Sequence, residues 1–454
     1  MDALSGAGAV VRGHTSSSQG QVAVSLARAG DPDPCFNITD QSEISPEAEM
    51  HDPQQLPWSR RLLVLCVVAA VAVSVIYLPQ PLLTDLARSL GTSEAAASVI
   101  ATTVQAGYAV GIFFLVPLAD RVQPRRQISI QLTVLALAML LTAALPGVTA
   151  VAVGFLVVGL VANIAQLIIP TAGRLSPPEA RARTTSALVG ALVVGIFGGR
   201  VLASVLGGPL GWRWVAVVFA VLVLVLVPLV RRVLPSHVEL VSDVGYGRLL
   251  AATVGRLRTS AALRQSALMQ LFAFAAFNAV WTVMVLHLEA APYRWSVAQA
   301  GLFGLVGLAA GLVTPLAGRL VPRLGAVPVV GLSLLVLALA MATLVVDSHV
   351  LWGFALSTFA LTLASQSMQS ANQGRVLEAN ADGGAQANTV FMVAVFAGGS
   401  LGAAAGSAAF GWGGMPAVAG LGLLFLAVSA VGWLTATRHD RRHGPSRSTT
   451  PSPV

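Results

Sequence analysis

The stretch PLADR at residues 117–121 returns as PLAGR at residues 315–319, 198 positions later. Other matches lie at almost the same spacing and connect the following parts of the chain: Pro-Arg at 124–125 with 322–323, Gln166 with Gln366, GGR at 198–200 with GGS at 398–400, and Gly-Trp at 211–212 with 411–412. Because the spacing drifts by only two residues, we interpret the chain as a duplicated unit of about 200 residues.

Apolar runs of about twenty residues follow one another through both copies, and a helix of that length spans the hydrocarbon core of a bilayer. The runs are continuous and do not alternate with polar residues, which excludes the strands of a membrane barrel. Twelve such runs cover residues 62–83, 95–119, 127–146, 148–173, 184–210, 213–230, 265–290, 298–321, 327–346, 350–373, 386–410 and 416–437. We therefore predict an all-α integral membrane protein with 12 transmembrane helices in two six-helix halves.

Composition supports a lipid environment. Only 10% of the 454 residues are charged and 56% are apolar, whereas soluble proteins carry about a quarter charged residues. The net charge is +8, and all of the positive charge in it comes from arginine, because the sequence has no lysine. The arginines flank the apolar runs and form no stripe, so we expect no nucleic-acid partner. A P-loop ATPase is excluded because its phosphate loop needs a lysine.

The arginines also predict the orientation. An even number of crossings places both termini on one side, and 23 of the 27 arginines fall on that side. Three fall on the other side, Arg88, Arg213 and Arg294, and Arg200 lies within a run. Since loops rich in arginine remain in the cytoplasm, we expect both termini to be cytoplasmic and the protein to be a multi-pass protein of a bacterial inner membrane.

The domain organisation follows from the same pattern. We expect a disordered cytoplasmic tail at 1–57, a first half at 58–232, a cytoplasmic linker at 233–264, a second half at 265–437 and a cytoplasmic tail at 438–454. The linker stretch 247–264 is either an amphipathic helix on anionic lipid or a solvated connection. Translation begins at Met1 or, as an alternative, at Met50.

Two segments resemble the major facilitator superfamily, and the resemblance extends over residues 60–437. YLPQPLL at 77–83 is similar to the end of helix 1 in the bacterial proton-linked drug or sugar efflux branch. LADR at 118–121, followed by Arg125 and Arg126, resembles the family signature between helices 2 and 3. The resemblance implies a secondary active transporter that moves a small organic solute by alternating access, with proton-coupled efflux as the expected mode, no enzymatic activity and no cofactor.

Helix 5 both resembles and departs from the antiporter branch. Gly195 and Gly199 have the glycine spacing of its signature, but Arg200 stands where proline follows. The helix 4 arginine that is tied to proton coupling in relatives corresponds to Asn163. Uptake by proton symport and a non-transporting membrane sensor therefore remain as alternatives. A membrane-embedded enzyme is disfavoured, since neither metal-ligand spacing nor a carboxylate pair occurs within the runs.

The resemblance implies a cytoplasmic gate formed by Asp120, Arg121 and Arg125. A carboxylate at this place can pair with arginine and with the positive end of a neighbouring helix. The second copy has Gly318 in place of the aspartate, so we expect an asymmetric gate. The alternative is that Asp120 is simply a solvated loop charge.

Arg200 is the most unusual residue of the runs. It precedes Trp212 by twelve residues, which corresponds to about 18 Å of helix and places it near the middle of the membrane. A guanidinium there costs several kcal/mol unless it faces water or a partner. No acidic residue lies deep in any run, so we expect carbonyl groups, water or an anionic substrate group as its partners. The alternative to a role in substrate binding or coupling is structural hydrogen bonding.

The remaining candidates are polar side chains on helices 1, 4, 7 and 10, which line the central cavity in this family. We expect the substrate or coupling site to include Tyr77, Gln80, Asn163, Gln166, Asn278, Trp281, Gln366 and Gln369. Such amides are costly in lipid and therefore face the interior, although hydrogen bonding between helices explains them equally well individually. We expect a neutral or anionic amphiphile as substrate, protons as the coupling ion, lipid as the surroundings and a monomer, with no catalytic residue and no metal.

Overall fold

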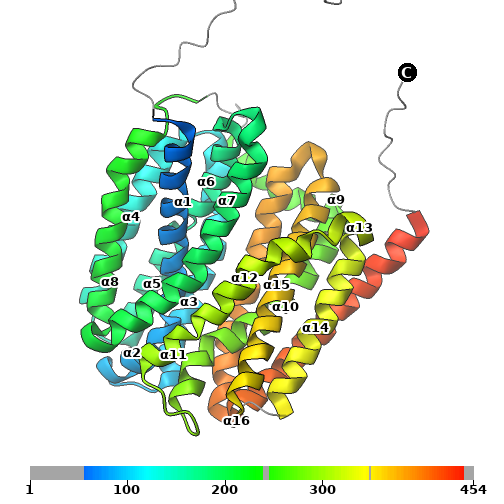
Figure 1. Cartoon of the computed structure of the whole chain (residues 1–454). Coiled ribbons are helices and arrows are strands. Elements are labelled where there is room, and N and C mark those ends of the chain that lie inside the picture. Colours follow the sequence, from blue (N-terminus) through cyan, green and yellow to red (C-terminus); the bar gives the residue numbers. More distant parts are fainter. Residues whose placement is uncertain (1–55, 239–244, 347–348, 444–454) are drawn as a thin grey trace, which may run out of the picture. The chain divides into compact units, whose positions relative to one another are not determined.

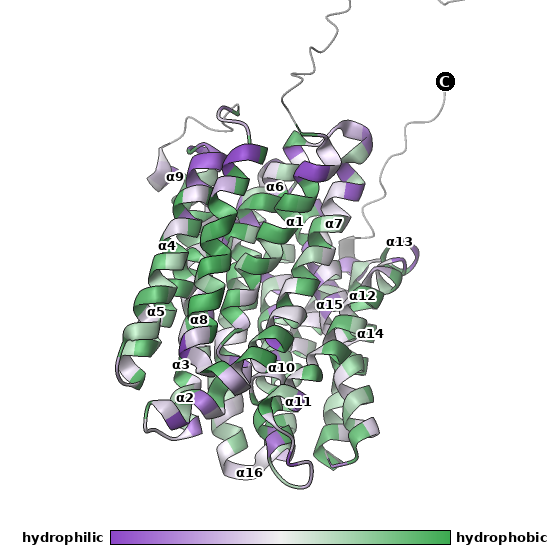
Figure 2. Ribbon diagram, turned by 60° about the vertical axis from the view of Figure 1, so that its left-hand side comes forward, coloured by the Kyte–Doolittle hydropathy of each residue, from purple (hydrophilic) through white to green (hydrophobic). Residues whose placement is uncertain are grey.

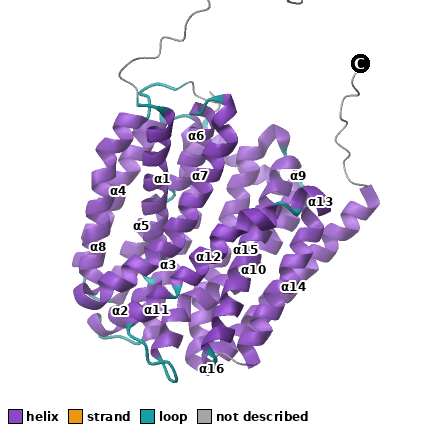
Figure 3. Cartoon of the chain, viewed as in Figure 1, coloured by secondary structure: helices purple, strands orange, loops and turns teal. Residues whose placement is uncertain are grey.

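Helices make up nearly all of the chain that the structure describes, and no strand occurs there (Figure 3). This computed structural model describes residues 56–238, 245–346 and 349–443. The expected disordered tail therefore lies outside the described residues up to position 55, with Met50 in it, and so does the C-terminal tail from residue 444 onward.

The first half follows the predicted runs closely. Its α-helices are α1 (Trp58–Ser74), α2 (Leu83–Ser89), α3 (Glu94–Leu115), α4 (Pro124–Ala144), α5 (Val148–Val161), α6 (Ile164–Leu175), α7 (Arg181–Val193) and α8 (Gly199–Val233). Short tight turns of 3-10 helix connect them: η1 (Val75–Tyr77), η2 (Gln80–Leu82), η3 (Pro117–Asp120) and η4 (Pro178–Ala180). A wider π-helical stretch, η5 (Val194–Gly198), separates α7 from α8.

The linker and the second half are also helical (Figure 1). They consist of α9 (Tyr246–Thr259), α10 (Ala261–Glu289), α11 (Val297–Leu302), α12 (Gly304–Gly318), α13 (Val321–Leu324), α14 (Ala326–Val346), α15 (Leu351–Glu378), η6 (Ala381–Gly383) and α16 (Gly384–His443). The predicted linker contains a helix, α9, which begins one residue before the stretch 247–264.

The helices account for the twelve predicted crossings. Nine segments of the described chain are long and apolar enough to span a membrane. Two of them hold two crossings each, because Gly211 in α8 and Gly413 and Gly414 in α16 have non-helical backbone angles that interrupt the helix. The twelfth crossing is α15, whose many polar side chains reduce its hydropathy. This is the predicted fold class.

Besides the bend after α1 and the π-helical stretch η5, two predicted crossings are interrupted where the sequence indicated continuous helix. The run 148–173 is divided between α5 and α6 at Asn163, and the run 298–321 is divided between α11 and α12 at Phe303. The amide of Asn163 donates to the carbonyl of Leu160 at 2.7 Å. Such a local bond competes with the regular helical ladder, which gives the first interruption a physical cause.

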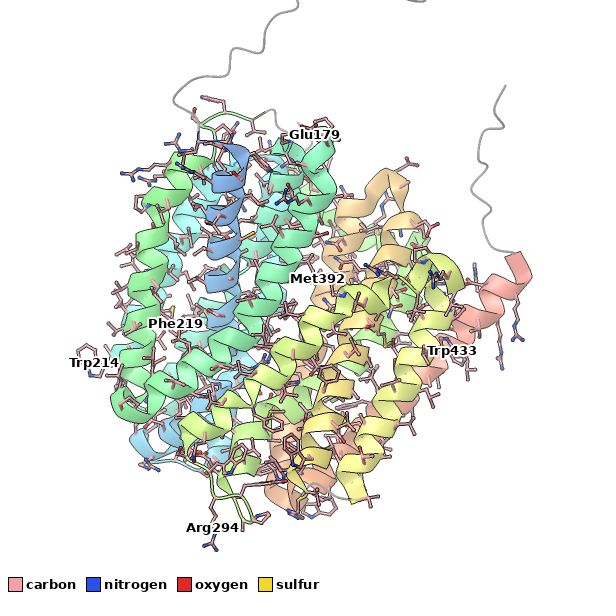
Figure 4. All side chains as sticks on the ribbon, viewed as in Figure 1. Glu179, Trp214, Phe219, Arg294, Met392 and Trp433 are labelled. Carbon is pink, nitrogen blue, oxygen red and sulfur yellow. The ribbon has the colours of Figure 1, made fainter. Side chains whose placement is uncertain are left out.

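Apolar side chains project from the outer faces of the crossings. Leu141, Val225 and Leu356 are 68%, 57% and 69% exposed, and Trp214 points outward from α8 (Figure 4). Hydrophobic residues also dominate the lengths of the helices, while polar residues gather toward their ends (Figure 2). A continuous apolar surface of this kind fits contact with lipid acyl chains. Because lipid offers no hydrogen-bond partners to the backbone, helices are suited to span it.

Within each half, small residues bring helices close together. An added Cβ at Gly398, Gly402 or Gly406 of α16 would overlap the backbone of α10. Gly107 and Gly111 of α3 approach the backbone of α5 in the same way. Close approach of this kind is the arrangement by which membrane helices gain van der Waals contact.

Candidate functional site

A bend after α1 brings the first polar group of the site to the interior. Pro79 and Pro81 flank Gln80, which lies in the short turn η2 and is only 2% exposed. Proline lacks an N–H group and cannot continue a regular helix. The chain therefore leaves the α-helical path here, and η2 lies against α8 of its own half and α10 of the other half.

Arg200 is held by neutral oxygen atoms. Its Nε and Nη2 atoms donate to Oε1 of Gln80 at 3.0 and 2.9 Å, and its Nη1 atom donates to the carbonyl of Ile196 at 3.1 Å. The side chain is 4% exposed. Within the described chain the one salt bridge joins Arg375 to Asp440, far along the sequence from this site. The guanidinium of Arg200 is thus buried, and no carboxylate among the described residues pairs with it.

Aromatic rings complete the surroundings of the guanidinium. Its carbon lies 4.1 Å from the ring centre of Tyr77, 5.0 Å from that of Trp281 and 5.4 Å from that of Phe197. Rings at these distances attract a cation through their negatively charged faces. Trp281 is itself fixed, because its Nε1 atom donates to the hydroxyl of Thr362 at 3.2 Å.

Gln80 connects Arg200 to the second half. Its Nε2 atom donates to Oδ1 of Asn278 and to Oγ1 of Thr282, both at 3.2 Å. Asn278 in turn donates to the carbonyl of Gly399 at 2.7 Å. A chain of hydrogen bonds therefore runs from α8 through η2 and α10 to α16, and it joins three of the predicted site residues, Arg200, Gln80 and Asn278. Two more, Tyr77 and Trp281, contact the guanidinium through their rings.

The π-helical stretch η5 immediately precedes this arginine. One wider turn of this kind rotates the residues that follow it, and π turns are frequent at functional sites. Its flanking glycines allow α1 to come close: an added Cβ would overlap Ala70 at Gly195 and Ser74 at Gly199. Close packing on α1 thus positions Arg200 against Tyr77 and Gln80.

A small cavity of about 10 Å³, with room for about one water molecule, adjoins Arg200. Gln80, Ser204 and Trp281 line it together with apolar residues of α10 and with Gly301 and Gly304. The hydroxyl of Ser204 is fully buried and has no hydrogen-bond partner among the described residues.

A larger cavity of about 250 Å³ lies between the halves toward the arginine-rich end. Asp120, Gln166 and Arg174 line it from the first half, and Gln386 and Thr389 line it from the second. The linker helix covers part of this cavity with Leu249 and Thr253, two of its buried residues.

The opposite end of the bundle is closed by contacts between the halves. Thr84 donates to the carboxylate of Glu289, and α8 packs against α11. Asp85 accepts from the backbone N–H of Trp212 at 2.6 Å and so fixes the turn between the crossings of α8. The described halves therefore meet at the end marked by Arg294 and enclose a cavity toward the end marked by Glu179 (Figure 4).

The other predicted residues lie away from Arg200. Asn163 is fully buried at the interruption of the fourth crossing and bonds within its own half. Gln166 and Asp120 line the larger cavity. Gln366 and Gln369 are half-buried on α15 and line neither cavity.

The predicted gate shows no closed clamp in this structure. Arg121 is exposed and Arg125 is half-buried, and neither forms a salt bridge with Asp120 among the described residues.

Sequence reasoning did not select Ser204 and Phe197, which the structure brings to the site, or the pairing of Thr84 with Glu289 at the closed end. Ser204 lies four residues after Arg200 and Phe197 lies three before it, so helical spacing from the arginine indicates both. The pairing of Thr84 with Glu289 joins positions 205 apart, and no local pattern of the sequence indicates it.

Comparison with known proteins gives the family. The sequence model described as Major Facilitator Superfamily matches residues 65–286 and 266–454. The chain is 36% identical to a probable transporter, SCO4007, of Streptomyces coelicolor over 84% of this chain and 87% of that protein. It is 29% identical to an uncharacterized transporter, YgaY, of Escherichia coli O157:H7, over 82% and 94% of the two chains.

A solved structure supports the fold. The crystal structure of the nucleoside transporter NupG is similar to this one with a TM-score of 0.67, 14% identity, and coverage of 83% of this chain and 99% of that one. At this identity the similarity concerns the fold alone. The family match covers both halves, and the described chain has the twelve crossings expected of it. This chain therefore belongs to the major facilitator superfamily of multi-pass membrane transporters.

Proposed function

We propose that this transporter exports a small organic solute from the cytoplasm in exchange for protons, as in the drug and sugar efflux branch that its helix 1 resembles. It works as a monomer in a bacterial inner membrane, with both termini in the cytoplasm. The observation that carries the proposal is Arg200, a buried cation beside a cavity between the two halves. An arginine at this depth costs about 2.5–3.5 kcal/mol on insertion scales, and a solute-binding role accounts for its presence.

Each predicted residue has a place in this proposal. Arg200, Gln80, Asn278, Tyr77 and Trp281 form the central binding site. The hydrogen bonds between Gln80 and α10 join the halves at this point, so a solute that displaces them changes how the halves are held together. That change is the physical basis of alternating access.

The larger cavity provides the route from the cytoplasm. It lies toward the arginine-rich end, which the distribution of positive charge assigns to the cytoplasm. Gln166 lines this route, and we assign Asn163, Gln366 and Gln369 to its walls in other states of the cycle. Asp120, Arg121 and Arg125 then form the gate that closes it when the opposite end opens.

Inverted bacterial membrane vesicles test the direction and the coupling. Their cytoplasmic face is outward, so a proton-coupled exporter accumulates its solute when the vesicle interior is acidic. We expect accumulation of at least one compound from a chemically diverse panel, and we expect a protonophore to abolish it.

The alternatives give different results when inverted vesicles are compared with right-side-out vesicles. Accumulation only in right-side-out vesicles with an acidic exterior means uptake by symport. Binding of a compound without movement in either preparation means a sensor, and the proposal of transport then fails.

A further inference from the structure

The cavity beside Arg200 has the chemistry of an anion site with an apolar wall. We infer that it binds the carboxylate of a small monocarboxylate whose body is aromatic or aliphatic. This inference rests on the proposed function, because it names the class of solute that the central site accepts.

The guanidinium supplies donors that the protein does not use. Arginine has five N–H groups in a fixed fork, and three of its nitrogen atoms donate here to Gln80 and to the carbonyl of Ile196. These acceptors are neutral, so they leave the positive charge without a counter-charge. Cavity-lining donors of this type favour a planar anion that accepts two parallel hydrogen bonds.

A second, independent group points to the same ligand. Ser204 lies one helical turn after Arg200 and lines the same cavity. Its hydroxyl is 0% exposed and has no partner among the described residues. A buried hydroxyl without a partner destabilises the structure around it. A carboxylate bound by Arg200 would accept a hydrogen bond from this hydroxyl and relieve that cost.

No carboxylate of the described chain is placed to neutralise Arg200. Every acidic residue in those ranges lies near a helix end or in a connecting turn: Asp85, Glu94, Asp120, Glu179, Glu289, Glu378, Asp382 and Asp440. The positive charge of Arg200 therefore favours an anionic ligand and repels a cationic one. A neutral ligand would leave the charge uncompensated in surroundings of low polarity.

In this state the cavity has room for about one water molecule, so it admits the body of the ligand only when the halves move apart, and its opposite wall sets the polarity of that body. Trp281, Met284 and Val285 form its apolar face. At Gly301 an added Cβ would overlap Ser204, so the second half approaches closely at this point. An inorganic anion would leave the apolar face in contact with water, whereas a carboxylate with an apolar body covers it and gains free energy from the burial.

Thermal unfolding of the purified protein in detergent tests the inference without a transport assay. The probes are benzoate, hexanoate and cyclohexanecarboxylate, with benzamide, benzylammonium and inorganic phosphate at the same ionic strength for comparison. A ligand that binds the folded state raises the unfolding temperature by an amount that grows with the logarithm of its concentration once that concentration exceeds Kd. We expect a rise of this form with at least one carboxylate, and none with benzamide, benzylammonium or phosphate.

Two variants connect the binding to the cavity. Ser204→Ala removes one hydrogen bond to a charged group and should weaken carboxylate binding about tenfold. Arg200→Lys keeps the charge but loses the fork, so we expect a loss of at least tenfold in a variant that still folds. Arg126→Gln should bind as the unchanged protein does.

The outcomes separate this inference from the proposed function. The inference is overturned if no carboxylate raises the unfolding temperature with increasing concentration, if benzamide matches benzoate, or if Ser204→Ala and Arg200→Lys both bind as tightly as the original. Export of a neutral or cationic compound with any of these results leaves the transport proposal standing. Carboxylate binding without transport in either vesicle preparation leaves the site standing and removes the transport proposal.

Discussion

The fifth crossing of the first half and the first part of α16 pack in the same way in their respective halves. Gly195 and Gly199 lie against α1, and Gly398 and Gly402 lie against α10. In both halves small residues let the helix backbone approach its neighbour closely. The two copies therefore share their architecture, although only one of them carries an arginine beside the packing glycines.

The register of the two copies differs from the one that the sequence repeat indicates. The repeat aligns Gly198 with Gly398, but an added Cβ at Gly198 would contact only Val194 of the same segment. Packing instead aligns Gly195 with Gly398, three residues away from the sequence alignment. The π-helical stretch η5 lies at this point in the first half. Both copies therefore keep the contact with the neighbouring helix, but they differ in the side chains that face the other half.

The largest effect is expected where the copies differ in charge. Arg200→Ala should reduce transport roughly a hundredfold or more, because it removes about 3 kcal/mol or more of binding to a charged group. The protein should still insert and fold, since an alanine is well tolerated in a membrane helix. Transport in vesicles and the yield of folded protein from size-exclusion chromatography measure the two effects.

Ser400→Ala is the matched control in the second half. Ser400 aligns with Arg200 in the sequence repeat and donates to the carbonyl of Thr102 at 3.0 Å. Its loss should change transport only a few-fold, as expected for one neutral hydrogen bond of about 1 kcal/mol. Undiminished transport in Arg200→Ala would remove this arginine from the mechanism, and equal losses in both variants would argue for a structural role.

The next effect concerns the register itself. Gly398→Ala should destabilise the protein by about 1–3 kcal/mol, because the added Cβ overlaps the backbone of Leu271. Gly198→Ala should be nearly neutral, since nothing outside its own segment lies within reach. Thermal unfolding in detergent compares the two. Similar destabilisation in both would favour the register of the sequence repeat over the one that packing defines.

The sequence predicts the crossings well because hydropathy and arginine placement are local properties. The interruption at Asn163 was not predicted, because it depends on a side-chain bond to Leu160 that competes with the helix. The division at Phe303 has no sequence signal that we can identify. The count of crossings therefore follows from composition, whereas the shape of each crossing depends on individual contacts.

The candidate site was predicted in part. Arg200 is evident from the sequence, because a charge in the middle of an apolar run is costly. Gln80 and Asn278 were both expected at the site. Their hydrogen bond joins the two halves of the bundle, and no local sequence pattern indicates it. The unpartnered hydroxyl of Ser204 is likewise visible only once its neighbours are placed.

A smaller effect is expected at the closed end. Thr84→Val removes the hydroxyl that donates to Glu289, and the loss of a hydrogen bond to a charged group should shift the equilibrium toward opening about tenfold. A cysteine at Ser204, in a chain whose own cysteines are replaced by serine, reports the opening through its reaction with a membrane-impermeant reagent. The reagent is added on the side of the membrane that carries Arg294.

The control for this change is Thr103→Val. The hydroxyl of Thr103 donates to the carbonyl of Ile100 within the same helix, so its loss should leave the reaction rate of the reporter cysteine unchanged. A Thr84→Val variant that reacts no faster than this control would show that the hydrogen bond does not contribute to closure of that end.

The smallest effect is expected where the linker helix crosses between the halves. Tyr246 at the start of α9 donates its hydroxyl to the carbonyl of Phe114 in the first half at 2.6 Å, and Arg256 near its end donates to the carbonyl of Asp382 in the second half at 3.0 Å. Both contacts are exposed, and an exposed hydrogen bond contributes about 0.5–1.5 kcal/mol at most.

Tyr246→Phe should therefore change the rate of transport by no more than a few-fold in either direction. The free energy of unfolding should stay within about 1 kcal/mol of that of the original protein. Because α9 covers part of the larger cavity, its release should act on entry of the solute from the arginine-rich end. The concentration of solute at half-maximal rate should change more than the maximal rate. A change confined to the maximal rate would mean that α9 influences the movement of the halves and has no part in access to the cavity.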